Sequence, residues 1–133
     1  MKPALELKTK VVFIKDTPPG RSISYGRTFI TQKHTRIATL PIGYADGYGR
    51  KLSNKAEVLI RGQRARVVGK VTMDQAMIDV GHIPDVKVGD EVVLIGKQGN
   101  EEIRAENLAR MAESIAYEVV CGISNRVPRV YKY

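Results

Sequence analysis

The chain has 133 residues, of which 43% are hydrophobic and 27% charged, the composition of one ordinary globular domain. The single cysteine excludes an internal disulfide and favours a reducing compartment, so we expect the protein in the cytoplasm. No apolar run approaches the ~20 residues of a membrane-spanning helix, so we expect no membrane partner. The formal net charge of +8 leaves nucleic acid open as a partner.

The first part of the chain predicts strands. Apolar and polar residues alternate over residues 5–16, LELKTKVVFIKD, which predicts one long, half-exposed strand with Val11 and Phe13 on its apolar face. The sequence TPPG then predicts a turn, because proline fixes φ and glycine frees it. Two further strands are expected over residues 27–32 and 35–43.

The middle of the chain predicts a loop, a hairpin and more strands. Residues 43–54, GYADGYGRKLSN, are rich in glycine and polar residues and predict a long loop. Residues 56–70, AEVLIRGQRARVVGK, predict a hairpin with Gly62 in its turn. Short strands are expected over residues 75–80 and 90–96, and KQGN predicts a turn after the second of them.

One helix is expected late, over residues 105–116, with Arg104 at the N-cap position, where arginine is a poor cap. Its apolar stripe consists of Leu108, Met111, Ala112 and Ile115. The tail RVPRVYKY predicts an extended edge segment, since proline is confined to sheet edges. About seven short strands and one late helix predict a mainly β fold class, a small Greek-key-like β-barrel forming a single domain over residues 1–133.

Local chemistry taken alone selects no enzyme class. His34 and His82 lie far apart in the sequence, so we expect no metal site. The glycine-rich GYADGYG lacks the order of a nucleotide-binding loop, and no nucleophile elbow is present. A basic β-barrel that binds RNA is one alternative, although only 6% of residues are aromatic, which leaves few platforms for base stacking.

Five motifs in chain order resemble the C-terminal domain of alanine racemase. They are SYGRTF, LPIGYADGYGRKL, VVGKVTMDQAMIDV, GDEVVLIGKQG and YEVVCGISNRVPRVY, and the resemblance runs from Leu5 to Tyr131. It implies a homodimeric isomerase that uses pyridoxal 5′-phosphate to interconvert L- and D-alanine, supplying D-alanine for the cell wall. It also implies that each subunit has an N-terminal (β/α)₈ barrel that carries the Schiff-base lysine, and that this domain lies against the barrels of its own and the partner subunit. Residues 1–133 do not contain this barrel.

The resemblance implies a role for each matching residue. Tyr25 of SYG is the acid/base group that exchanges the proton of the L-enantiomer in the other subunit's active site. Met73 of MDQ binds the substrate carboxylate through its backbone N–H, and Tyr117 of YEV binds the cofactor phosphate. Tyr44 and Arg50 line the substrate entrance.

Each of these residues also has an ordinary structural interpretation. Tyr25 can be a half-buried strand residue, and Met73 can be a filler of the core. A phenol has a pKa near ~10, so Tyr25 needs a nearby cation to act as a base at neutral pH, and Arg27 is a local candidate. Lys70 and Thr72 stand where many family members carry arginine and cysteine, which bears on the entrance and not on the reaction class.

Two further alternatives remain besides RNA binding. The chain can be a dimerisation or regulatory domain that keeps the fold without the reaction, or part of a racemase for another amino acid, such as serine. Under the alanine racemase hypothesis, the chain is an excised or separately made domain. We then expect that it does not racemise alanine by itself.

Overall fold

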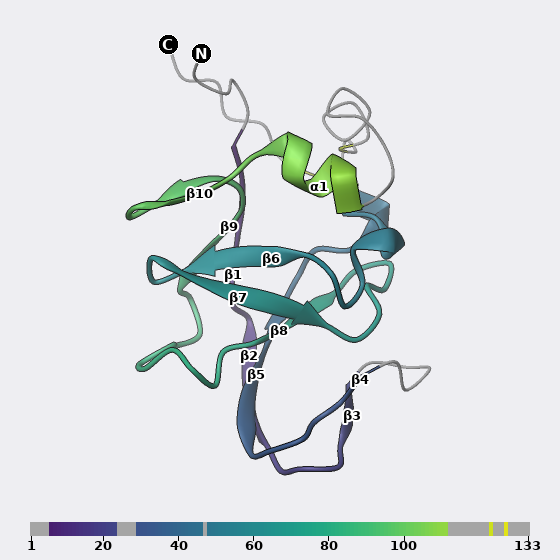
Figure 1. Cartoon of the computed structure of the whole chain (residues 1–133), viewed down its shortest axis with the longest axis vertical. Helices are drawn as coiled ribbons and strands as arrows, with labels where there is room; N and C mark the ends of the chain where they lie inside the picture. The colour runs from purple at the N-terminus through teal and green to yellow at the C-terminus, as the bar shows by residue number, and fades with distance from the viewer. Residues whose placement is uncertain (1–5, 24–28, 47, 112–122, 124–126, 128–133) are drawn as a thin grey trace.

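The computed structural model describes residues 6–23, 29–46, 48–111, 123 and 127, and over these residues the chain is mainly antiparallel β with one late helix (Figure 1). The strands are β1 (Leu7–Lys10), β2 (Phe13–Thr17), β3 (Ser22–Ile23), β4 (Phe29–Ile30), β5 (Thr35–Leu40), β6 (Glu57–Ile60), β7 (Gln63–Val68), β8 (Ala76–Asp79), β9 (Glu91–Gln98) and β10 (Glu101–Ile103). Two 3₁₀ turns, η2 (Tyr44–Asp46) and η3 (Arg50–Leu52), follow β5, and α1 (Ala105–Met111) follows β10.

An eight-stranded antiparallel sheet forms the body of the molecule, in the order β1-β9-β6-β7-β8-β5-β2 with β10 also paired to β9. Strands β3 and β4 form a separate pair, which projects beyond β2 and β5 at one end of the molecule (Figure 1). Strands β6, β7, β8 and β9 supply 11 of the 26 buried residues of the main core, and the others come from the remaining strands, the connections and α1. The mainly β fold class with one helix is confirmed, and the strand order of the described residues runs as an open path from β1 to β2.

The N-terminal strand prediction is wrong in one respect, because residues 5–16 form two strands that belong to opposite ends of the strand order. The Val11 N–H donates to the Asp90 carbonyl oxygen beside β9, while the Val12 N–H donates to the Thr39 carbonyl oxygen on β5, both at 3.0 Å. The chain therefore changes neighbours between these two valines. Val11 is buried, but Phe13, expected on the same face, is 57% exposed.

The central hairpin is confirmed as β6 and β7, joined by Arg61 and Gly62 with φ values of 51° and 74°. Positive φ at both turn residues gives the twist that antiparallel strands favour. Strands β8 and β9 and the KQGN turn are also confirmed, and of the described residues 29–32 in the strand expected over 27–32, Phe29 and Ile30 form β4. The expected loop 43–54 contains η2 and η3, and β10 was not predicted because its sequence, EEI, is too short and polar to show alternation.

The late helix begins where the sequence predicts. Arg104 takes the N-cap position, and the Asn107 Oδ1 accepts a hydrogen bond from the Arg104 N–H at 2.8 Å. The Asn107 N–H donates back to the Arg104 carbonyl oxygen at 3.0 Å, so Asn107 compensates for the poor cap. Leu108 is buried and Met111 packs against the core. Ala112, Ile115 and all of the tail except Val127 lie outside the described residues, and Val127 packs against the core.

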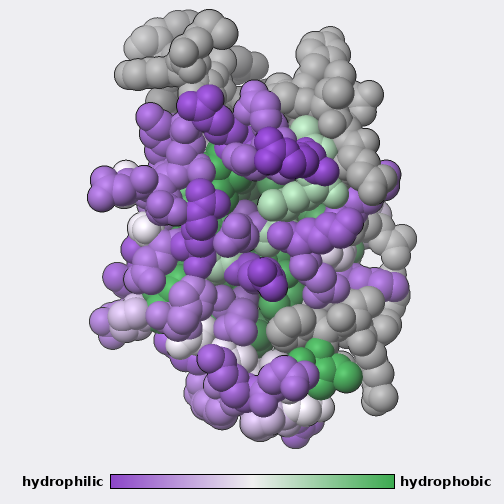
Figure 2. Space-filling view, in the orientation of Figure 1, coloured by the Kyte–Doolittle hydropathy of each residue, from purple (hydrophilic) through white to green (hydrophobic). Residues whose placement is uncertain are grey.

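The surface in Figure 2 is mostly hydrophilic, with hydrophobic atoms visible between charged and polar side chains. In the described part of the chain, no helix has the length and apolar character needed to cross a membrane.

Candidate functional site

Two connections of the fold carry the predicted site residues that the structure describes. Tyr44 begins η2 and Arg50 begins η3, both in the connection between β5 and β6. Met73 lies in the connection between β7 and β8, with its side chain 49% exposed. Tyr25 and Tyr117 lie outside the described residues.

Backbone hydrogen bonds join these two connections. The Tyr44 N–H donates to the Thr72 carbonyl oxygen at 2.9 Å, and the Ala45 N–H donates to the Met73 carbonyl oxygen at 3.1 Å. The contact is so close that a Cβ atom on Gly43 would lie 2.1 Å from the Thr72 carbonyl oxygen, so only glycine fits there. Tyr44 and Met73, distant in sequence, are therefore held in adjacent backbone segments.

A buried carboxylate fixes the turn that makes this contact. The Asp46 Oδ2 accepts a hydrogen bond from the Gly43 N–H at 3.0 Å. The Asp46 N–H donates back to the Gly43 carbonyl oxygen, also at 3.0 Å. Asp46 is only 8% exposed, and a hydrogen-bonded carboxylate shielded from water holds its geometry firmly.

The Met73 segment has its own local support. The Thr72 N–H donates to the Gln75 carbonyl oxygen at 2.9 Å, and the Gln75 N–H donates to the Thr72 Oγ1 at 3.1 Å. No acceptor for the Met73 N–H is found among the described residues, while the Met73 carbonyl oxygen accepts from the Ala45 N–H. The 49% exposure of Met73 contradicts its interpretation as a filler of the core.

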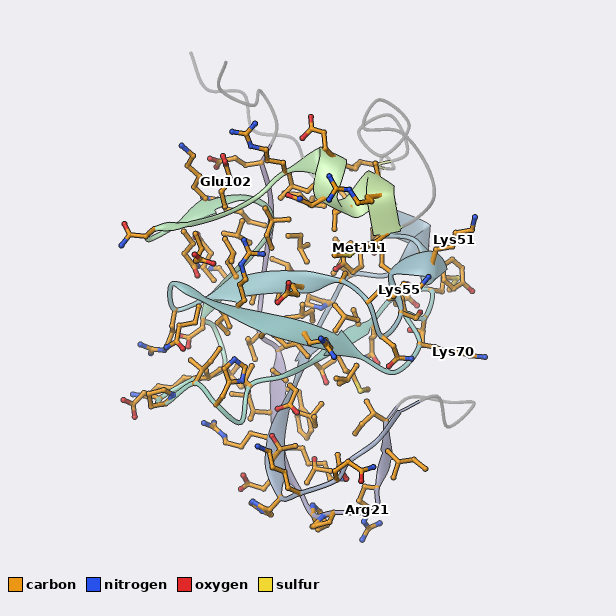
Figure 3. All side chains as sticks on the ribbon, viewed as in Figure 1. Arg21, Lys51, Lys55, Lys70, Glu102 and Met111 are labelled. Carbon is orange, nitrogen blue, oxygen red and sulfur yellow. The ribbon has the colours of Figure 1, made fainter. Side chains whose placement is uncertain are left out.

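Basic side chains surround the two connections. Figure 3 shows Lys51, Lys55 and Lys70 on the same side of the molecule. Lys51 follows Arg50 directly, and Lys70 precedes Thr72 by two residues, so these cations come from the segments that carry the site. Positive charge gathered around a site attracts anionic ligands such as carboxylates and phosphates.

The helix before Tyr117 also belongs to this region. Helix α1 contacts η3, and Figure 1 shows the two lying side by side. The buried Leu108 anchors α1 to the core. The residues that lead toward Tyr117 therefore start beside the turn that carries Arg50.

The strand pair next to Tyr25 is fixed at its base by a buried threonine. The Thr31 Oγ1 donates to the Pro18 carbonyl oxygen at 2.8 Å and accepts from the Arg21 N–H at 3.0 Å. Strand β3 ends at Ile23 and β4 begins at Phe29, and their pairing brings these ends together. Ile23 packs with Ile37 and Val68 in a small second core, which ties the pair to the main sheet.

Sequence reasoning missed Tyr48. It shares the loop with Tyr44, yet Tyr48 is completely buried while Tyr44 is 45% exposed. Burial raises the pKa of the Tyr48 phenol, and the same burial keeps its side chain packed in the core of the loop and away from solvent. Tyr44 lies between a glycine and an alanine, and Tyr48 lies between two glycines, so the local sequence does not show which of them is buried.

Replacing Tyr48 by phenylalanine should reduce the fall in the free energy of unfolding with rising pH at alkaline pH. The unfolded chain loses this phenolic proton near pH ~10 while the folded chain keeps it, so the free energy of unfolding falls as pH rises above that value. The contribution of this residue is about 1.4 kcal/mol per pH unit. Urea unfolding at pH 7 to 11 should show a steeper loss for the native chain than for Tyr48→Phe.

At pH 7, Tyr48→Phe should be at least as stable as the native chain, because the Tyr48 hydroxyl has no hydrogen-bond partner among the described residues. Parallel alkaline slopes for both chains would show that the Tyr48 phenol ionises as easily in the folded state as in the unfolded one.

The site geometry can be compared with known proteins. The family model described as "Alanine racemase, C-terminal domain" matches residues 4–131. The chain is 59% identical over 132 residues to an alanine racemase of Halothermothrix orenii, covering 99% of this chain and 35% of that protein. It thus spans about a third of the length of the curated relatives it matches.

Solved structures give the same match. The structure of an alanine racemase from Bacillus anthracis with bound L-Ala-P has a TM-score of 0.93 and 47% identity, over 99% of this chain and 33% of that one. An alanine racemase from Clostridium difficile in complex with cycloserine has a TM-score of 0.87 and 46% identity, over 96% of this chain and 33% of that one.

Proposed function

Since the chain belongs to the alanine racemase C-terminal domain family, we propose that it acts as that domain in an alanine racemase, interconverting L- and D-alanine. The family match over residues 4–131 carries this proposal. The relatives' names support the reaction, and the alanine-derived ligand and the cycloserine in two of the solved relatives support an amino-acid site.

In this proposal residues 1–133 form one domain, and an N-terminal (β/α)₈ barrel elsewhere in the protein carries the Schiff-base lysine. The protein is a cytoplasmic homodimer that supplies D-alanine for the cell wall. Each β-domain lies against the barrels of its own and the partner subunit, and neither nucleic acid nor membrane takes part.

The sheet of this domain closes, in our proposal, into a Greek-key-like β-barrel. The two ends of the strand order, β1 and β2, are consecutive in the chain. Val11 and Val12 between them bond to opposite sides, at Asp90 and Thr39. The continuous backbone then links the two edges without a ladder between them.

Tyr25 is proposed as the acid/base group for the proton of the L-enantiomer in the partner's active site. The Met73 N–H, which has no acceptor among the described residues, binds the substrate carboxylate. Tyr44 and Arg50 line the entrance, and the surrounding lysines favour the entry of an anionic substrate end. Tyr117 donates a hydrogen bond to the phosphate of pyridoxal 5′-phosphate.

Pyridoxal phosphate, when bound, takes up the electron pair left at the substrate α-carbon. The described residues fit such a partner in one respect: the Met73 N–H, which has no acceptor among them, and the nearby cations suit the carboxylate of an amino acid beside it. The residues of this chain orient the substrate and move a proton at the Tyr25 hydroxyl.

The proposal is tested by assaying the full-length protein, supplied with pyridoxal phosphate, for conversion of L-alanine to D-alanine. We expect turnover of alanine well above that of serine, and none from a polypeptide of these 133 residues alone. A full-length protein that binds the cofactor but turns over neither amino acid would favour a dimerisation or regulatory role. Faster turnover of serine would change the substrate and keep the reaction.

A further inference from the structure

We propose that Asp46 is a positioning residue that sets the register between Tyr44 and Met73, and so between the substrate entrance and the carboxylate-binding N–H. This inference deepens the proposed racemase function and rests on it for its kinetic consequence. Its structural part rests only on the described contacts of the turn 43–46.

The first step is the closed turn. Asp46 accepts from the Gly43 N–H through its side chain and donates to the Gly43 carbonyl oxygen through its backbone, each at 3.0 Å. These reciprocal bonds fix the backbone between them, which is the backbone of Tyr44 and Ala45. Because Asp46 is 8% exposed, water competes little for the carboxylate.

The second step is the direction of the next amides. With the turn closed, the Tyr44 and Ala45 N–H groups point at the Thr72 and Met73 carbonyl oxygens, at 2.9 Å and 3.1 Å. The Met73 carbonyl oxygen is therefore held by an amide of the turn that Asp46 closes. The Met73 N–H shares its peptide plane with the Thr72 carbonyl, so the bond from the Tyr44 N–H orients it too, and the Thr72–Gln75 turn supports the same segment from the other side.

The third step is what the arrangement leaves open. The side chains of Tyr44 and Met73 are both about half exposed although their backbones are in contact. The buried members of the segment are Asp46 and Tyr48, so the turn is anchored in the protein while Tyr44 and Met73 keep about half of their surface exposed.

The chain offers a matched control for Asp46. The Asp90 Oδ2 accepts from the Lys87 N–H at 2.9 Å, and the Asp90 N–H donates back to the Lys87 carbonyl oxygen at 3.1 Å. The same pair of bonds thus closes a turn before β9 that carries no proposed site residue. Asp90→Ala removes the same side-chain bond as Asp46→Ala at a turn away from the site, together with the ion pair from the Arg61 Nε to the Asp90 Oδ2 at 3.0 Å.

The experiment compares Asp46→Ala, Asp46→Asn and Asp90→Ala in the full-length protein with pyridoxal phosphate. Hydrogen exchange, resolved to single amides by mass spectrometry, should be at least ~10-fold faster at Tyr44 and Ala45 in Asp46→Ala than in the native protein. The kcat/KM for alanine should fall by ~100-fold, the usual effect of a small misplacement of binding groups.

Asp46→Asn keeps an acceptor oxygen and should recover most of both losses, whereas Asp90→Ala should leave kcat/KM unchanged. Native exchange at Tyr44 and Ala45 in Asp46→Ala would overturn the proposal. Equal losses of kcat/KM in Asp46→Ala and Asp90→Ala would also overturn it, because the effect would then be general destabilisation. Absence of racemase activity in the native protein would instead refute the proposed function, and the exchange measurement would still test Asp46.

Discussion

Replacing Tyr25 by phenylalanine in the full-length enzyme is expected to lower kcat for racemisation by ~100- to 10,000-fold, the range that a positioned acid/base group contributes. The loss of kcat/KM should be the same in both directions, since an enzyme cannot change the equilibrium between the enantiomers and that equilibrium fixes the ratio of the two kcat/KM values. Binding of the cofactor should be unchanged, because Tyr25 is not proposed to hold it. The measurement is the steady-state rate from each enantiomer over a range of substrate concentrations, which gives kcat and kcat/KM.

Tyr48→Phe is the matched control for Tyr25→Phe, since it removes the same hydroxyl from a buried tyrosine of the same domain. Burial keeps the Tyr48 phenol protonated, so its removal should leave kcat within a few-fold of the native value. Comparable rates for Tyr25→Phe and the native enzyme would assign Tyr25 to the structural role that its strand context also allows.

Gly43→Ala is expected to have the largest effect on the fold of the site. A Cβ at this position would lie 2.1 Å from the Thr72 carbonyl oxygen and 2.6 Å from the Met73 carbonyl carbon and oxygen. Those neighbours are backbone atoms, which cannot rotate away, so the two connections must separate. We expect the free energy of unfolding to fall by ~3 kcal/mol, at the upper end for an overpacked position, and urea unfolding measures this.

Gly49→Ala controls for glycine replacement in the same loop. A Cβ on Gly49 meets no atom within 4 Å, and Gly49 is not among the glycines with positive φ. Its replacement should change stability by less than ~1 kcal/mol, or increase it slightly through the unfolded state. Similar losses for Gly43→Ala and Gly49→Ala would show that the loop does not depend on close contact with Thr72 and Met73.

Much of the fold could be predicted because its signals are local. Two apolar segments around a glycine turn predict the hairpin β6–β7. Apolar residues at helical spacing predict α1. The division of residues 5–16 into two strands could not be predicted, since alternation continues through Val11 and Val12. Only the position of their partners, Asp90 and Thr39, shows that the chain changes neighbours there.

The residues of the candidate site were named from the sequence and their roles stay predictions, whereas the contact between the two segments that carry them was not predicted. Motif resemblance identified Tyr44 and Met73, but nothing local joins GYAD to TMDQ. Their contact depends on glycine at position 43 and on the carboxylate of Asp46, neither of which was identified from sequence as a positioning group. Tyr48 was missed for the same reason, because burial is decided by packing that the loop sequence does not encode.

The most direct test of the central claim follows α-proton exchange in deuterated water, with the full-length enzyme, pyridoxal phosphate, and L- or D-alanine supplied separately. Tyr25 is assigned only to the proton of the L-enantiomer. Tyr25→Phe should therefore abolish exchange from L-alanine while D-alanine still exchanges. If both enantiomers exchange as fast in Tyr25→Phe as in the native enzyme, Tyr25 moves no proton, and the mechanism assigned to this domain is wrong.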